Sequence, residues 1–281
     1  MSMLKQNISK ILKLIFSISE NYHLRVITIM GIRIKHRRPG IKYSIYDHGQ
    51  NNSVIVNDDF VGEILIEGDN NKIDFTNLKI INSLTKIYGN NHNVKFNKSC
   101  IQKFSIDIGN NSNQPDNCII EIGENTSMVN AVFLLFETNS KISIGKNCLI
   151  SFDVELRNSD MHTVINSKKE VLNTGKSIEI GDHVWIARDV TIGKNTKIPS
   201  NCIVGQGAVV TKQFEEENCV IAGNPAKICK RGINWDGRPV DIYIKENSNN
   251  IISKTLVGRE RERERERVIA NYANYSHLIA A

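Results

Sequence analysis

The chain has 281 residues and a formal net charge of +6, with hydrophobic residues at 40% and aromatic residues at 6%. Nucleic-acid binding favours a concentrated basic patch with interleaved aromatic residues, whereas the basic residues here are spread along the chain. No run approaches the roughly 18 apolar residues that span a bilayer, and no small-residue cleavage site follows the apolar start. The six cysteines form no CxxC pair, which favours free thiols over disulfides or a metal site. The composition predicts a cytoplasmic protein of many short strands.

Residues 1–42 are predicted to form a helical and basic N-terminal segment. Within residues 4–20, apolar residues recur at helical spacing, at Leu4, Ile8, Ile11, Leu12 and Ile15. The first interpretation is a helix that packs on its own domain or on a partner subunit. The alternative is a basic amphipathic helix that rests on a membrane surface, helped by the basic run at 33–38.

A repeat of Gly-x-Asn-Asn type occupies residues 45–125. It recurs as GQNN, GDNN, GNNH and GNNS, at starts that are 19, 21 and 20 residues apart. Between these words lie short alternating runs, each the length of one strand. Because glycine and asparagine tolerate positive φ, one such pair per repeat marks a fixed corner of a coil.

A period of six follows, and residues 178–213 show it most clearly. An aliphatic residue is third in every block of six, at Ile180, Ile186, Ile192, Ile198, Val204 and Val210. Three sixes make about one upstream repeat, so residues 43–235 are predicted to wind as a triangular coil with three strands per turn. Each third-position aliphatic then points inward and stacks on its equivalent about 4.8 Å away. The open ends of such a solenoid need caps, here the N-terminal helix and the segment after residue 225.

The period breaks between Leu156 and Ile178, so residues 157–177 are predicted to leave the coil as an inserted loop. Solenoids carry function on such excursions, since the coils themselves offer little chemistry. This loop holds His162, two residues after Asp160. If the segment is extended, both side chains project to one side, and a carboxylate there would select the tautomer of the imidazole or bind a substrate hydroxyl.

Residues 236–281 are predicted to be a C-terminal extension, disordered or weakly helical, that includes RERERERER at 259–267. Alternating Arg and Glu is also what the DNA dinucleotide repeat (AG)n encodes. A second hypothesis is therefore a slippable tract that shifts the reading frame and changes the C-terminus.

The hexapeptide array, the D-x-H loop, HVWIARDVTIGKNTKIPSNCIVGQGAVVTK and AGNPAK together resemble the hexapeptide-repeat acyltransferases. Within that family the sequence is most similar to the O-acetyltransferases of bacterial capsule, O-antigen and exopolysaccharide synthesis. The resemblance is strong over about 140–235, weaker back to about 45, and absent in the tail. It implies an all-β fold, a left-handed parallel β-helix of hexapeptide repeats, and a homotrimer with active sites between adjacent subunits. It further implies acetyl-CoA as the donor, a saccharide acceptor and no metal.

The resemblance also implies the site residues. His162 would be the general base that takes the proton of a sugar hydroxyl and returns it to the CoA thiolate, with Asp160 beside it. Trp185 would pack on the pantetheine arm or form a wall of the acceptor cleft. The positions that match the family's CoA contacts are Arg188, Gln206, Thr211, Lys212, Lys227 and Lys230. Relatives have Gly or Ser where this chain has Arg188 and Gln206.

Three other functions fit parts of the sequence. An N-acetyltransferase of a nucleotide-linked amino sugar would share the fold and need a nucleotide pocket. A metalloenzyme of the carbonic anhydrase kind needs three histidines, and only His162 and His183 lie near the break. A non-catalytic scaffold that docks a glycosyltransferase would need no base at all.

Overall fold

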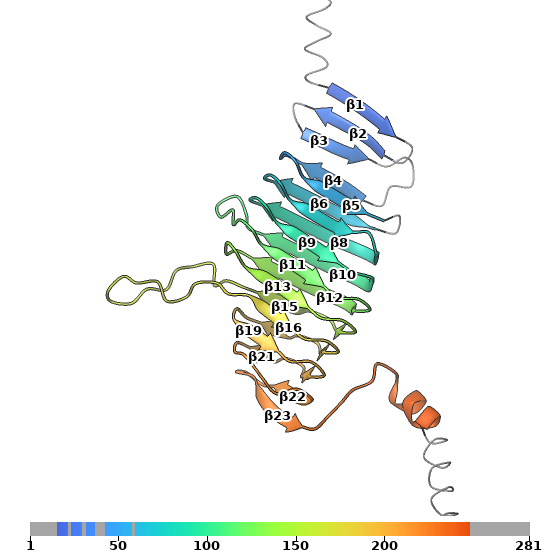
Figure 1. The fold of residues 1–281 in the computed structure, drawn as a ribbon, viewed down its shortest axis with the longest axis vertical. Coiled ribbons are helices and arrows are strands. Elements are labelled where there is room, and N and C mark those ends of the chain that lie inside the picture. The colour runs from blue at the N-terminus through green and yellow to red at the C-terminus, as the bar shows by residue number, and fades with distance from the viewer. Residues whose placement is uncertain (1–15, 22–23, 30–31, 37–42, 58–59, 248–281) are drawn as a thin grey trace, which may run out of the picture. The chain divides into compact units, whose positions relative to one another are not determined.

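The computed structural model describes residues 16–21, 24–29, 32–36, 43–57 and 60–247. Residues 1–235 and residues 236–281 form two separate compact units. In the first unit the chain winds as a stack of coils, a left-handed parallel β-helix, which confirms the predicted fold class (Figure 1).

One face of the β-helix is a seven-stranded parallel sheet in which strands from successive coils are neighbours. In chain order its strands are β5 (Ser53–Val56), β7 (Lys72–Phe75), β9 (Asn93–Phe96), β11 (Ile119–Ile122), β13 (Lys141–Ile144), β16 (Ile178–Ile180) and β19 (Thr196–Ile198).

The other two faces belong to one sheet that bends around an edge of the prism. Its parallel part begins with β4 (Tyr43–Asp47), β6 (Gly62–Glu67), β8 (Leu78–Tyr88), β10 (Ser99–Ile108) and β12 (Ser127–Leu135). The first part of β12 pairs with β14 and its second part with β15, so the two faces separate there. One face continues through β14 (Leu149–Ile150), β17 (Trp185–Ile186), β20 (Ile203–Val204) and β22 (Cys219–Ala222), and the other through β15 (Val154–Arg157), β18 (Thr191–Ile192) and β21 (Val209–Val210).

The core is the stack of third-position aliphatics that the period of six predicts. All six of these residues are at most 4% exposed. The pairs Ile180–Ile198, Ile186–Val204 and Ile192–Val210 are in register on neighbouring strands, so one coil takes three sixes. The longer N-terminal coils hold phenylalanines instead, and the rings of Phe75 and Phe96 lie 5.1 Å apart.

The Asn-rich corners hold the N-terminal coils together. Asn51, Asn70 and Asn91 adopt positive φ, as the Gly-x-Asn-Asn words predict. In the first two words the residue that follows is again an asparagine, and it bonds the coil beside it. The backbone N–H of Asn71 donates to Asn52 Oδ1 at 2.8 Å, and the Asn71 side chain donates to the carbonyl of Gly89 at 3.1 Å. Each repeat therefore satisfies the backbone of its neighbour.

The helix predicted for residues 4–20 is wrong where the structure describes it. Three antiparallel strands are found there, β1 (Phe16–Asn21), β2 (Leu24–Ile29) and β3 (Ile32–His36), and β3 pairs with β4. FSISEN and IRIKH place apolar residues at alternate positions, which is the period of a strand. An antiparallel meander therefore takes the place expected for a helical cap. Residues 4–15 lie outside the described residues, and the membrane-surface interpretation stays a prediction.

At the other end, the segment after residue 225 returns as β23 (Lys227–Arg231), antiparallel to β22. In the second unit, residues 240–247 are helical, and Arg238 pairs with Asp236 at 2.6 Å and lies 5.0 Å from the ring centre of Tyr243. The Arg–Glu tract at 259–267 lies outside the described residues. Among the helices that the structure does describe, none is long and apolar enough to cross a membrane.

Candidate active site

The inserted loop leaves the β-helix after β15 and rejoins it at β16, and Figure 1 shows it projecting far from the coils. Two buried polar residues anchor its base. The side chain of Asn158 accepts the backbone N–H of Phe136 at 2.9 Å, and the hydroxyl of Ser159 donates to Glu137 Oε1 at 2.6 Å. Further out, the Ile165–Val171 bridge and the bond from Leu172 N to Val164 O (2.8 Å) close the loop into a narrow finger. The coil therefore fixes the base of the loop.

A hollow of about 440 Å³ lies at this base. Asp160 and Thr211, both implied site residues, line it together with the cations Arg157, Lys176 and Lys194. The Asp160 carboxylate accepts hydrogen bonds from the Lys194 ammonium and from Asn173 Nδ2. These two hydrogen bonds, that from Lys194 first, lower the pKa of Asp160 below its ordinary value. The hollow thus holds one ionised carboxylate among three positive charges.

His162 is exposed, just outside this hollow. The expectation that Asp160 and His162 project to one side assumed an extended segment, and the positive φ of Met161 (61°) turns the chain between them. The link that forms is indirect. Asn173 Nδ2 donates both to the Asp160 carboxylate and to the backbone carbonyl of His162, each at 2.8 Å. Asn173 therefore holds the backbone of His162 against Asp160, and the imidazole stays open to a substrate.

Two other implied CoA positions lie at a different edge of the prism. Arg188 and Gln206 follow β17 and β20 on consecutive coils, and the backbone N–H of Gly207 donates to the carbonyl of Arg188 at 3.0 Å. Both side chains are exposed, and Arg188 pairs with Asp189 at 3.3 Å. Asp160 and Thr211 lie instead at the edge between the β15–β18–β21 face and the seven-stranded sheet. Within one chain, the residues expected at the active site therefore lie at two different edges of the prism.

The remaining implied lysines are exposed near the C-terminal end of the β-helix. The ammonium of Lys212 lies 5.0 Å from the ring centre of Phe214. Lys227 and Lys230 belong to β23, where Lys227 pairs with Ala222 and Lys230 with Val220. All three are free to approach an anionic ligand from solvent.

Trp185 is half-buried on β17, and its ring centre lies 6.1 Å from that of Trp235. The sequence interpretation did not single out Trp235, Lys194 or Asn173. The only signal for Trp235 was that the chain has just two tryptophans. Lys194 and Asn173 carried none, because their roles depend on contacts with Asp160 at separations of 34 and 13 residues.

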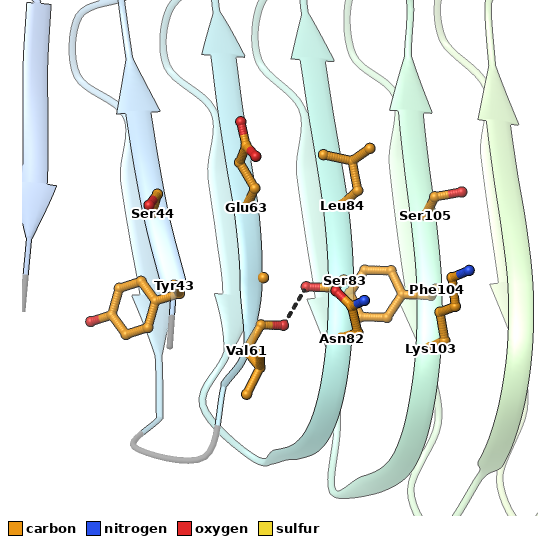
Figure 2. A pocket seen from close by; sticks show the side chains of 11 residues that line it. Tyr43, Ser44, Val61, Glu63, Asn82, Ser83, Leu84, Lys103, Phe104 and Ser105 are labelled. Carbon is orange, nitrogen blue, oxygen red and sulfur yellow. Dashed lines mark hydrogen bonds between the residues drawn. The ribbon is translucent and has the colours of Figure 1, made fainter. Parts of the chain in front are cut away.

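A larger hollow, of about 720 Å³, crosses the N-terminal coils. Figure 2 shows Ser44, Glu63, Leu84 and Ser105 in a row across four strands, with Lys103 beside it. None of the residues expected at the active site lines it, so the smaller hollow is the better candidate. Among the described residues no group of three His, Cys, Asp or Glu side chains is placed to hold a metal ion.

Comparisons with known proteins agree with this architecture. Residues 177–212 match the family model described as bacterial transferase hexapeptide (six repeats). A polysialic acid O-acetyltransferase from Escherichia coli O1:K1 / APEC is 41% identical over 81 residues, 28% of this chain. The match spans only 26% of that protein's length.

Two solved structures match over a longer stretch. The polySia specific acetyltransferase NeuO is 28% identical, with a TM-score of 0.63, over 71% of this chain and 91% of its own. The polysialic acid O-acetyltransferase OatWY is 34% identical, with a TM-score of 0.51, over 70% of this chain and 92% of its own. The similarity to these two structures thus covers most of the β-helix and is not confined to the hexapeptide motif.

Proposed function

Because this chain belongs to the hexapeptide-repeat acyltransferase family, we propose that it transfers an acetyl group from acetyl-CoA to a hydroxyl of a bacterial capsule polysaccharide. The similarity to OatWY over 92% of that structure carries the proposal. Since the donor is a cytoplasmic thioester, the reaction belongs in the cytoplasm.

In the proposed reaction, His162 is the general base. A sugar hydroxyl is a weak nucleophile near neutral pH, so its proton must leave as its oxygen attacks the thioester carbonyl carbon. Imidazole suits this task, because it can hold and release a proton near neutrality. The carbon–sulfur bond then breaks, and the proton passes from His162 to the CoA thiolate. The exposure of His162 supports this role, since an acceptor can reach its ring from solvent.

The donor would lie along the C-terminal coils. Its phosphates would pair with exposed cations, for which Lys212, Lys227 and Lys230 are available. Arg188, Gln206 and Thr211 would meet the pantetheine arm, and Trp185 would pack beside it. These are the positions that match the family motif, and at two of them, Arg188 and Gln206, relatives have Gly or Ser.

The division of these positions between two edges supports a homotrimer. Within one chain, Asp160 and the base of the His162 loop belong to one edge, and Arg188 and Gln206 to another. In a cyclic trimer, one edge of each subunit meets a different edge of the next. The projecting finger of one subunit would then complete a site with Arg188 and Gln206 of its neighbour.

The acceptor would be an acidic polysaccharide. Arg157, Lys176 and Lys194 line the hollow with the carboxylate of Asp160, and Arg157 also pairs with Glu155 at 2.9 Å. These three cations and two carboxylates leave an excess of one positive charge. Such a lining attracts an anionic sugar and repels a cationic one. The relatives in the comparisons are named for polysialic acid, an acidic polymer, which supports the same class of acceptor.

The test is acetyl transfer with purified protein, acetyl-CoA and a panel of acidic and neutral capsular oligosaccharides. Acidic acceptors should gain the mass of one acetyl group. His162→Ala should lower kcat by about 100-fold or more, the range for loss of a general base. His48→Ala is the matched control, because His48 is a partly exposed histidine that pairs with Glu67 in the N-terminal coils. Unchanged turnover in His162→Ala would rule out this base.

A further inference from the structure

The chain does not leave the β-helix directly after β23. The backbone N–H of Ile233 donates to the carbonyl of Asn218 at 2.9 Å, and Asn218 Nδ2 donates to the carbonyl of Ile233 at 3.3 Å. Asn218 is one of a column of corner residues with positive φ, which includes Asn201 and His183 on the two preceding coils. Residues 232–235 are therefore held against this corner and run back along it.

Trp235 is the last residue of this segment, and its ring packs on the ring of His183. The two rings are stacked, with centres 4.3 Å apart and an angle of 10° between their planes. The indole N–H of Trp235 also donates to the backbone carbonyl of His183 at 2.8 Å. His183 is itself fixed, because its Nδ1 lies 3.1 Å from Asn201 Oδ1. A stack and a hydrogen bond together define both the place and the orientation of the Trp235 ring.

Trp185 is the third ring of this cluster. It lies two residues after His183, at the start of β17, with its ring centre 6.1 Å from that of Trp235 and the planes at 48°. Such a tilted contact is within the range in which aromatic pairs attract each other. Trp185 is only half-buried, so its own coil does not enclose the ring. Trp235 therefore packs against a part of the Trp185 ring that the coils leave uncovered.

We propose that Trp235 is a positioning residue for acetyl transfer, which holds the Trp185 ring in the orientation that the reaction needs. The proposal rests on the proposed function, in which Trp185 packs beside the pantetheine arm that carries the acetyl group. Trp235 touches neither substrate. It acts through Trp185, and His183 serves as its support. A side chain at a reacting centre needs such a neighbour to stay in one rotamer.

A purely structural role for Trp235 would be to cover the last coils. That role predicts an effect of substitution on melting temperature and none on Trp185 itself. The positioning role predicts a change in the environment and motion of Trp185, and a loss in kcat that exceeds any loss in substrate binding. The two roles therefore differ in what they predict for one identified ring.

The chain offers a clean probe, because Trp185 and Trp235 are its two tryptophans. In Trp235→Phe and in Trp235→Ala, all tryptophan fluorescence comes from Trp185. Phenylalanine keeps a ring on His183 and loses only the indole hydrogen bond, whereas alanine loses both. We expect Trp185 to emit at longer wavelength and with lower anisotropy in Trp235→Ala than in Trp235→Phe.

In the acetyl-transfer assay, Trp235→Ala should lower kcat by roughly 3- to 10-fold, the factor that one aromatic pair contributes. Trp235→Phe should recover most of this loss, and any rise in KM for acetyl-CoA should be smaller than the fall in kcat. Tyr243→Ala is the control for removal of an aromatic residue in the second unit, and it should match the wild type.

Identical Trp185 emission and anisotropy in the two Trp235 variants would overturn the proposal, as would equal kcat in both. The fluorescence comparison needs no turnover. If no acceptor is acetylated at all, the proposed function fails while the contact between the two rings is still tested. A melting temperature measured for each variant separates loss of fold from loss of position.

Discussion

Asp160 combines the charge and the geometry of the candidate site in one side chain. Its carboxylate bonds the Lys194 ammonium, on the coil that follows the loop, and Asn173 at the far end of the loop. Because these hydrogen bonds lower its pKa, Asp160 stays ionised throughout the pH range in which a histidine works as a base. Its role is therefore to hold the start and the end of the loop on the coil.

We expect Asp160→Asn and Lys194→Gln each to lower kcat/KM. The kcat/KM of the double variant should be no lower than that of the less active single variant. Both substitutions break the same contact, so their effects should not add. A double-mutant cycle on acetyl transfer measures this. Additive losses would mean that the two side chains act separately on the substrate.

His92 is a buried residue whose protonation should govern stability in acid. It takes the corner position that asparagine holds in the two preceding repeats, and its Nδ1 accepts the backbone N–H of Cys118 at 3.0 Å. It is 1% exposed, and burial lowers its pKa below the ordinary value of 6.5. The folded protein therefore keeps His92 neutral where the unfolded chain would bind a proton.

The free energy of unfolding should fall as the pH drops below about 6.5, because there the unfolded chain binds more protons. Urea unfolding between pH 7.5 and pH 5 measures this dependence. His92→Asn should flatten it, since an asparagine at this corner can accept the same N–H without titrating. An equal pH dependence in both proteins would assign the effect to other groups.

At the scale of the elements, each strand from β13 to β22 contributes one or two buried residues, and stability comes from stacking between coils. Ile186 is 0% exposed, and its register partners Ile150 and Val204 are also fully buried. A cavity in one coil therefore removes contacts with the coils on both sides. Loss of a buried side chain should therefore be destabilising in any coil.

Ile186→Ala should lower the free energy of unfolding by about 2–5 kcal/mol, the range for large-to-small substitutions in a core. Ile55→Ala is the matched control, because Ile55 is 49% exposed on β5. That change should cost less than about 1 kcal/mol. Chemical denaturation of both variants measures the difference, and equal losses would contradict the inward assignment of Ile186.

For the whole molecule, the central question is whether one subunit carries a complete site. His162 and Arg188 belong to different edges of the β-helix. If neighbouring subunits share each site, His162→Ala and Arg188→Glu should complement each other in mixed trimers. Random mixing in equal amounts leaves about a quarter of the interfaces with both residues intact.

Co-expressed variants should therefore recover activity that neither has alone. Light scattering on the mixture checks the trimer mass. Activity equal to the mean of the two parents would place the whole site within one chain.

The sequence by itself determined the repeating part of this protein. A period of six identifies the inward residues, and Gly-x-Asn-Asn words identify corners, because both depend on backbone geometry that repeats locally. The break in the period located the inserted loop. The N-terminal meander was missed, because helical spacing over residues 4–15 was extended into a stretch whose alternation is that of strands.

Only the tertiary structure decided which distant side chains meet. Lys194 reaches Asp160 across 34 residues, and Trp235 reaches His183 across 52. Neither contact recurs at a fixed sequence spacing, since each arises where a non-repeating segment returns to a coil. Short-range backbone preferences fix the coils, but contacts through space depend on where those segments come back. The sequence therefore specifies the scaffold, and tertiary packing assembles the candidate site on it.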